Sequence, residues 1–111
     1  MKRIWRAFFY SIDGILAAWR EEPAFRQEAL LAAIMIPGAF FITADRIALI
    51  LMIGSVLLVL ALELLNTAVE AAINRIGAEL HPLSKKAKDA ASAAVLVALV
   101  NAAFVWGMII F

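Results

Sequence analysis

Hydrophobic positions along the chain fall into one amphipathic segment followed by three long apolar runs. In residues 1–20 the apolar side chains recur at helical spacing, and the lysines, arginines and Asp13 fall off that stripe. A basic helix with tryptophan on its apolar side is typical of a helix that lies in the membrane interface. A helix packed on protein is the alternative that this pattern leaves open.

Each of the three apolar runs predicts a helix that crosses a bilayer. The predicted spans cover residues 25–43, residues 47–70 with a helical extension to about 76, and residues 90–111. Pro23 is expected to break the chain before the first span, and Pro37 with Gly38 predicts a kink inside it. Gly77 is a candidate C-cap after the second span. We therefore expect an all-α integral membrane domain with three transmembrane helices plus an N-terminal amphipathic surface helix.

The distribution of basic residues predicts the orientation. Nine of the ten lysines and arginines lie in the N-terminal region or in residues 75–89, and Arg46 alone lies between the first two spans. Basic segments stay on the cytoplasmic side. The N-terminal helix and residues 75–89 are therefore expected to be cytoplasmic, with Arg46 on the opposite side.

Composition supports this class and excludes others. The chain of 111 residues is 66% hydrophobic and has a mean hydropathy of +0.96, too apolar for one small soluble core. It has no cysteine, which excludes disulfides, thiolate chemistry and cysteine zinc sites. The net charge of +1 forms no single basic face, so no nucleic-acid partner is expected.

An acidic stripe stands at the inner end of the second span. Glu63 and Glu70 are separated by about 700° of helical turn and about 10 Å of rise, with Asn66 on the same face. A polar group in a span can snorkel to water or join helices by hydrogen bonds. Two carboxylates and an amide on one stripe exceed that need, and they suit magnesium binding or general-base catalysis.

Further polar residues cluster near the same membrane face. Three carboxylates precede or begin the first span, and the loop before the third adds four polar residues: Glu21, Glu22, Glu28, Glu79, His81, Lys88 and Asp89. No phosphate loop, dinucleotide motif, soluble-kinase motif or H-E-x-x-H motif is present. The residues alone therefore leave three functions open: an enzyme acting on lipid, a subunit of an ion-coupled transporter, and an assembly module. Three spans enclose little space, so a homo-oligomer with composite sites is expected.

Two segments carry a resemblance to a known family. ELLNTAVEAAINRIGAELHPLSKKAKDAASAAV (63–95) and AAWREEPAFRQE (17–28), with E-x-x-N-x-x-x-E followed by A-K-D, resemble the prokaryotic diacylglycerol kinases. The resemblance covers nearly the whole chain. It implies a homotrimer in the bacterial inner membrane, a transferase of phospholipid biosynthesis with Mg²⁺-ATP as phosphate donor and a lipid alcohol as acceptor.

The resemblance also implies roles for residues at matching positions. Glu63 would be the general base, Asn66 would lie beside it, and Glu22 and Glu70 would hold the metal on the ATP phosphates. The other nucleotide contacts implied are Arg3, Tyr10, Glu79, His81, Lys88 and Asp89. The residues implied to line the lipid access are Ala24, Phe25, Arg26, Gln27, Glu28 and Ser92.

Asn74 and Asp13 depart from the family's pattern. Asn74 stands where relatives commonly have an acidic residue, and Asp13 where a basic residue would help to hold phosphates. The family has a diacylglycerol branch and an undecaprenol branch. We expect diacylglycerol as the acceptor, with undecaprenol as the alternative within the family and a non-enzymatic membrane module as the alternative of another class.

Overall fold

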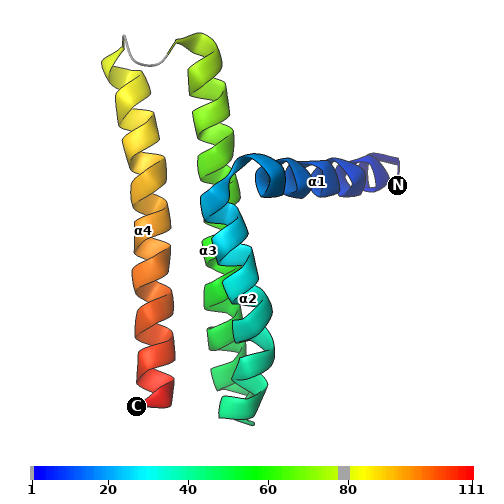
Figure 1. The fold of residues 1–111 in the computed structure, drawn as a ribbon, viewed down its shortest axis with the longest axis vertical. Coiled ribbons are helices and arrows are strands. Elements are labelled where there is room, and N and C mark those ends of the chain that lie inside the picture. Colours follow the sequence, from blue (N-terminus) through cyan, green and yellow to red (C-terminus); the bar gives the residue numbers. More distant parts are fainter. Residues whose placement is uncertain (1, 78–80) are drawn as a thin grey trace.

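The computed structural model describes residues 2–77 and 81–111, which form four helices. They are α1 (Lys2–Glu21), α2 (Pro23–Ile42), α3 (Arg46–Ile76) and α4 (Pro82–Ile110). Figure 1 shows α2, α3 and α4 running alongside one another and α1 projecting sideways. The helix α3 is central, since it contacts each of the other three. The predicted all-α fold with three long apolar helices is confirmed.

The corner between α1 and α2 forms where proline was expected to interrupt the chain. The helix α1 ends at Glu21, and Pro23 is the first residue of α2, where its missing N–H is no loss. The Arg26 guanidinium donates to the carbonyl oxygens of Trp19 at 2.9 Å and Arg20 at 3.1 Å. These bonds satisfy carbonyls that the end of α1 leaves without helical partners. Arg26 therefore fixes the direction in which α1 leaves the bundle.

Local capping sets the ends of the longer helices. The Asp45 carboxylate accepts a hydrogen bond from the Ala48 N–H at 2.9 Å and caps the start of α3. Gly77 adopts a φ of 96° at the end of α3, which confirms the predicted C-cap. His81 Nδ1 accepts from the Leu83 N–H at 3.1 Å at the start of α4. Pro37 lies inside α2, which continues as helix past it.

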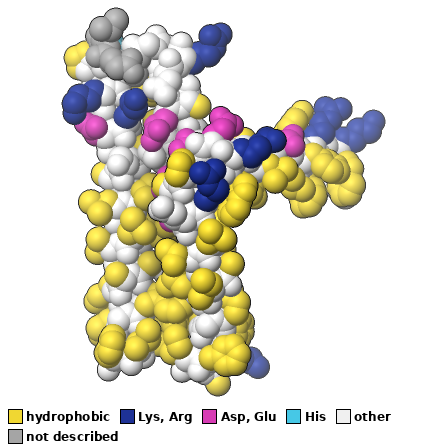
Figure 2. Space-filling view, viewed as in Figure 1, with side chains coloured by type: hydrophobic (Ala, Val, Ile, Leu, Met, Phe, Trp, Pro, Cys, Tyr) yellow, Lys and Arg dark blue, Asp and Glu magenta, His cyan; other side chains and the backbone are white. Residues whose placement is uncertain are grey.

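The core of the three long helices is small and lies toward the α2–α3 turn. It is made of Ala32, Ala39, Met52, Val56 and Trp106. The Trp106 indole N–H donates to the Met52 carbonyl at 3.1 Å and to the Ser55 hydroxyl at 3.2 Å, which joins α4 to α3. Most other large apolar side chains face outward, as the yellow surface below the charged band in Figure 2 shows.

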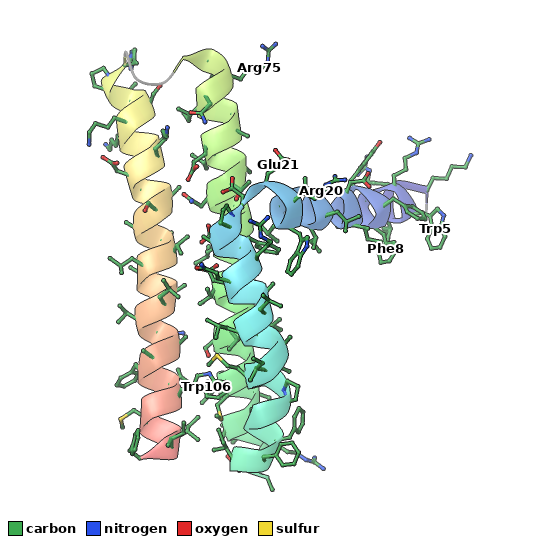
Figure 3. All side chains as sticks on the ribbon, viewed as in Figure 1. Trp5, Phe8, Arg20, Glu21, Arg75 and Trp106 are labelled. Atoms are coloured by element: carbon green, nitrogen blue, oxygen red, sulfur yellow. The ribbon has the colours of Figure 1, made fainter. Side chains whose placement is uncertain are left out.

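All three long helices are apolar and long enough to cross a membrane. They are α2, α3 and α4; α4 begins at residue 82, before the predicted start of the third span at 90. How much of each helix lies in the bilayer stays a prediction. On α1, Trp5 and Phe8 are exposed and point to the side on which α2 and the C-terminal part of α4 extend (Figure 3).

Candidate active site

One face of α3 carries the polar residues that the sequence singled out. Glu63, Asn66, Glu70 and Asn74 follow each other at spacings of three or four residues, which places them on one side of a helix. The Asn66 amide donates to the Glu70 Oε1 at 2.8 Å. This bond holds the Glu70 carboxylate along the helix and leaves its second oxygen open to a ligand.

Glu63 lies deepest of the four and faces another acid. It is 7% exposed, and its carboxyl group meets that of Glu28 between α3 and α2. The buried Glu28 Oε2 has no hydrogen-bond partner among the residues that the structure describes. Two buried carboxyl groups so near each other, with no basic partner in the described residues, do not stabilise the fold, because burial of an uncompensated charge is unfavourable. The pair instead offers acceptor oxygens to a hydroxyl group.

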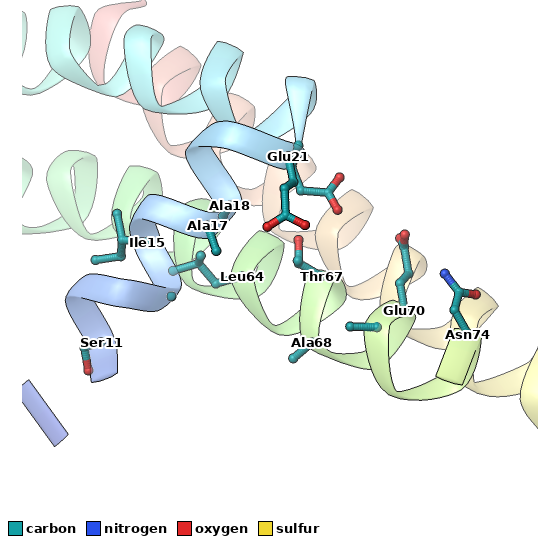
Figure 4. Close-up of a pocket in the computed structure, with 13 residues that line it drawn as sticks. Ser11, Ile15, Ala17, Ala18, Glu21, Leu64, Thr67, Ala68, Glu70 and Asn74 are labelled. Carbon is teal, nitrogen blue, oxygen red and sulfur yellow. The ribbon is translucent and has the colours of Figure 1, made fainter. Parts of the chain in front are cut away.

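An open pocket of about 650 Å³ lies next to this face, between the end of α1 and α3. Glu21 and Glu22 line it at the α1–α2 corner, and Glu70 and Asn74 line it from α3 (Figure 4). The structure thus brings together Glu22 and Glu70, the two carboxylates predicted to bind metal. Glu63 does not line this pocket and lies about two turns earlier on α3.

The helix α4 reaches the same region through a lysine. The Lys88 ammonium group donates to the Asn74 Oδ1 at 3.2 Å, and so joins α4 to the polar face of α3. Asp89 is paired with Lys85 on its own helix, at 2.6 Å, on an exposed surface. Figure 2 shows acidic and basic side chains gathered in a band at this end of the molecule.

Comparison with known proteins identifies the family. Residues 9–110 match the family model "Prokaryotic diacylglycerol kinase". The chain belongs to the prokaryotic diacylglycerol kinase family. The diacylglycerol kinase of Haemophilus influenzae is 54% identical over 92% of this chain and 86% of its own. That of Escherichia coli K12 is 46% identical over 94% and 85%, and that of Helicobacter pylori J99 is 46% identical over 96% and 83%.

Membership of this family makes the chain an ATP-dependent lipid kinase and a membrane protein. Its site has to join a donor dissolved in water to an acceptor held in the membrane. The observed arrangement suits that task, because the buried Glu63 and Glu70, which lines the open pocket, lie about two turns apart on one face of α3.

The carboxylates of this lipid kinase fit a magnesium ion carried by ATP. Within residues 2–77 and 81–111 no three His, Asp or Glu side chains are close enough to hold a metal alone. Magnesium commonly takes one or two carboxylates and completes its shell with phosphate oxygens and water. Glu22 and Glu70 both line one solvent-open pocket and would supply that part of the shell.

The other predicted nucleotide contacts are spread more widely over the kinase. Arg3 and Tyr10 line a separate hollow on the outer part of α1, and the structure does not bring them to the pocket between α1 and α3. His81 caps α4 and is exposed. Glu79 lies outside the described residues.

The residues predicted to line the lipid access do not form one surface within the chain. Phe25 is buried and Arg26 caps α1, while Ala24, Gln27 and Ser92 are exposed on α2 and α4. The Glu28 side chain meets Glu63 on the acidic face of α3.

Sequence reasoning assigned no site role to Ser11, Glu21 or Asn74, all of which line the pocket. Asn74 carried a signal that could have placed it there, since it follows Glu70 by one helical turn. Ser11 carried none, because the angle at which α1 leaves α2 decides what it faces.

Proposed function

We propose that this kinase transfers the γ-phosphoryl group of Mg²⁺-ATP to the hydroxyl group of diacylglycerol, which gives phosphatidic acid and ADP. One observation carries the proposal: a buried carboxylate and a carboxylate-lined open pocket share one helix face. Glu63 is buried at the membrane side, and the pocket with Glu22 and Glu70 is open to water. A lipid hydroxyl reaches the first position from the membrane, while ATP reaches the second from the cytoplasm.

Glu63 is proposed as the general base. Its carboxylate takes the hydroxyl proton while the hydroxyl oxygen bonds to the γ-phosphorus, and the bond from that phosphorus to the ADP oxygen breaks. Glu28 meets the same carboxyl group and has a buried oxygen without a hydrogen-bond partner in the described residues. Glu28 is proposed to help orient the lipid hydroxyl toward Glu63.

Glu22 and Glu70 are proposed to hold the magnesium ion that accompanies the phosphates. When bound, the ion neutralises charge on the phosphate oxygens as the phosphoryl group moves. The hydrogen bond from Asn66 to Glu70 supports this role, because it fixes one carboxylate oxygen of a residue that lines the pocket and leaves the other without a hydrogen bond in the described residues. Asn66 is thereby placed between the base and the metal ligand.

Further residues are proposed to bind the nucleotide and the lipid. Lys88 is held at the polar face of α3, close to the residues that line the pocket. Nucleotide contacts are also proposed for Arg3, Tyr10, Glu79, His81 and Asp89. Lipid contacts are proposed for residues 24–28 and Ser92.

The kinase is proposed to act as a homotrimer in the inner membrane, with α1 lying on the cytoplasmic surface. In the most apolar 18-residue stretch of each long helix, only 17 to 28% is buried within the chain. Lipid or neighbouring chains must cover the rest. Exposed Trp5 and Phe8, on the side of α1 on which α2 extends (Figure 3), support a helix seated on the bilayer.

The deciding experiment measures phosphate transfer from Mg²⁺-ATP to diacylglycerol in mixed micelles, with undecaprenol as a parallel acceptor. Glu63→Gln keeps the size of the side chain and removes the base, so we expect at least a thousandfold fall in kcat, within the range of general-base contributions to catalysis. Asp45→Asn is the matched control, since it neutralises an exposed carboxylate at the opposite end of α3, where asparagine caps a helix as well as aspartate does. It should retain wild-type kcat.

The variant must stay assembled for this comparison to be informative. We expect Glu63→Gln to keep a particle mass of three times the 12.1 kDa chain and to bind Mg²⁺-ATP as the wild type does. Undiminished turnover in Glu63→Gln would remove Glu63 from the role of base. Transfer to undecaprenol alone would keep the mechanism and change the acceptor.

A further inference from the structure

A single side-chain hydrogen bond joins α3 to α4 at the end of the molecule that holds the pocket. It runs from the Lys88 Nζ to the Asn74 Oδ1 and joins two helices at residues 14 positions apart in the sequence. In the described part of the chain, the other side-chain hydrogen bonds between α3 and α4 come from Trp106, in the apolar core at the far end. The bond from Lys88 therefore links α4 to the polar face of α3, apart from the links in the apolar core.

Asn74 places this lysine at the pocket. It lines the pocket together with Glu70, which precedes it by one turn on the same face of α3. Lys88 is half-buried, and its ammonium group reaches Asn74 in a solvent-exposed hydrogen bond. The ammonium group thus stands at the edge of the space next to the proposed metal ligands.

The neighbouring lysines of α4 behave differently. Lys85 is bound to Asp89 on its own helix, on a surface where both side chains are largely exposed, and Lys86 is exposed. A lysine side chain is long and flexible, and it loses much rotamer freedom when it is fixed to one ligand. An acceptor that holds the ammonium group in place beforehand reduces that loss when phosphate binds.

We propose that Asn74 is a positioning residue for the nucleotide: its amide oxygen holds Lys88 at the edge of the pocket, where the ammonium group meets the phosphates of ATP. Asn74 acts through Lys88 and does not itself contact the reacting atoms. This inference rests on the proposed function, because it presumes that the pocket receives a nucleotide.

The test is a double-mutant cycle of Asn74→Ala, Lys88→Met and the two combined, in the full chain reconstituted into nanodiscs. Binding of a non-hydrolysable ATP analogue with Mg²⁺ is measured by calorimetry, and KM and kcat are measured for Mg²⁺-ATP and for diacylglycerol. Loss of one solvent-exposed hydrogen bond of ordinary strength predicts a rise of about three- to tenfold in Kd and in KM for the nucleotide. KM for diacylglycerol should not change.

The cycle separates a positioning role from a structural one. In the Lys88→Met background, Asn74→Ala should add less than about 1.5-fold, because the two residues act as a unit. Asn74→Asp retains an oxygen where Oδ1 stands, and should restore the nucleotide affinity to within about threefold of wild type. Lys86→Met is the matched control: it removes an exposed lysine of the same helical turn and should leave every constant unchanged.

Three results would overturn the proposal. They are an unchanged nucleotide affinity in Asn74→Ala, an equal loss with and without Lys88, and a loss that Asn74→Asp does not recover. The proposed function fails separately, if the wild type binds the nucleotide but transfers no phosphate to diacylglycerol. In that case the binding cycle still decides the role of Asn74.

Discussion

The Glu63 carboxyl group is buried, and the side chain closest to its charge is another acid. Burial of a carboxylate costs free energy unless a cation or several donors compensate it, and Glu28 carries no positive charge and can offer at most one donor, its own carboxyl proton. A glutamine at either position would keep the packing and relieve the repulsion. The acidic pair is therefore explained by chemistry at this point of α3 and not by stability.

Metal dependence separates Glu70 from Glu63. Removal of one carboxylate ligand by Glu70→Gln should raise the Mg²⁺ concentration for half-maximal activity by roughly tenfold or more, since even loss of an outer-shell partner has that effect. Glu22→Gln should act alike, because both residues line one pocket. A magnesium titration at saturating ATP measures the effect. Wild-type magnesium dependence in both variants would contradict the proposed metal site.

At the residue scale, the sequence predicted what depends on helical spacing alone. The common face of Glu63, Asn66 and Glu70 follows from a period of 3.6 residues. The contact between Glu28 and Glu63 and the bond between Lys88 and Asn74 could not be predicted, because each depends on how two helices pack side by side. Arg26 was assigned to the lipid, and the structure places its guanidinium on the end of α1.

At the scale of the helix, ends were predictable where a residue has a strong local preference. Pro23 and Gly77 mark ends because proline lacks an N–H and glycine tolerates positive φ. The start of α4 was less predictable. Residues 82–89 are mostly polar and form the first turns of a helix whose apolar part begins only after them. Hydropathy identifies the part of a helix suited to lipid and not its full length.

The contact between α3 and α4 in the apolar region depends on Trp106. Trp106→Phe keeps an aromatic ring but removes the donor to the Met52 carbonyl and the Ser55 hydroxyl. We expect a loss of about 1 kcal/mol in the free energy of unfolding, typical of a hydrogen bond between helices in a membrane. Reversible unfolding in mixed detergent measures it.

Trp5→Phe is the matched control for that variant, because the Trp5 ring is 66% exposed on α1. Its stability should stay within about 0.5 kcal/mol of wild type, as for most surface substitutions. An equal loss of unfolding free energy in the two variants would show that the indole hydrogen bonds between α3 and α4 do not stabilise the fold.

At the scale of the whole molecule, charge and apolar surface are separated along the long axis of the three helices. The proposed site lies at the end that carries most of the charged side chains, and Arg46 lies at the opposite end, where α3 begins (Figure 2). This separation agrees with a chain that spans a bilayer and works at one face. It also requires that the charged end face the compartment that contains ATP.

The orientation can be tested with single cysteines, because the chain has none of its own. Ala44→Cys lies in the turn between α2 and α3, and Lys86→Cys lies near the start of α4; both positions are exposed. With Arg46 on the outer side, a membrane-impermeant maleimide should label Ala44→Cys in intact spheroplasts. It should label Lys86→Cys only after permeabilisation, and Lys2→Cys should follow Lys86→Cys. Labelling of Lys86→Cys in intact spheroplasts would put the pocket on the side without ATP, and the kinase could not work in that orientation.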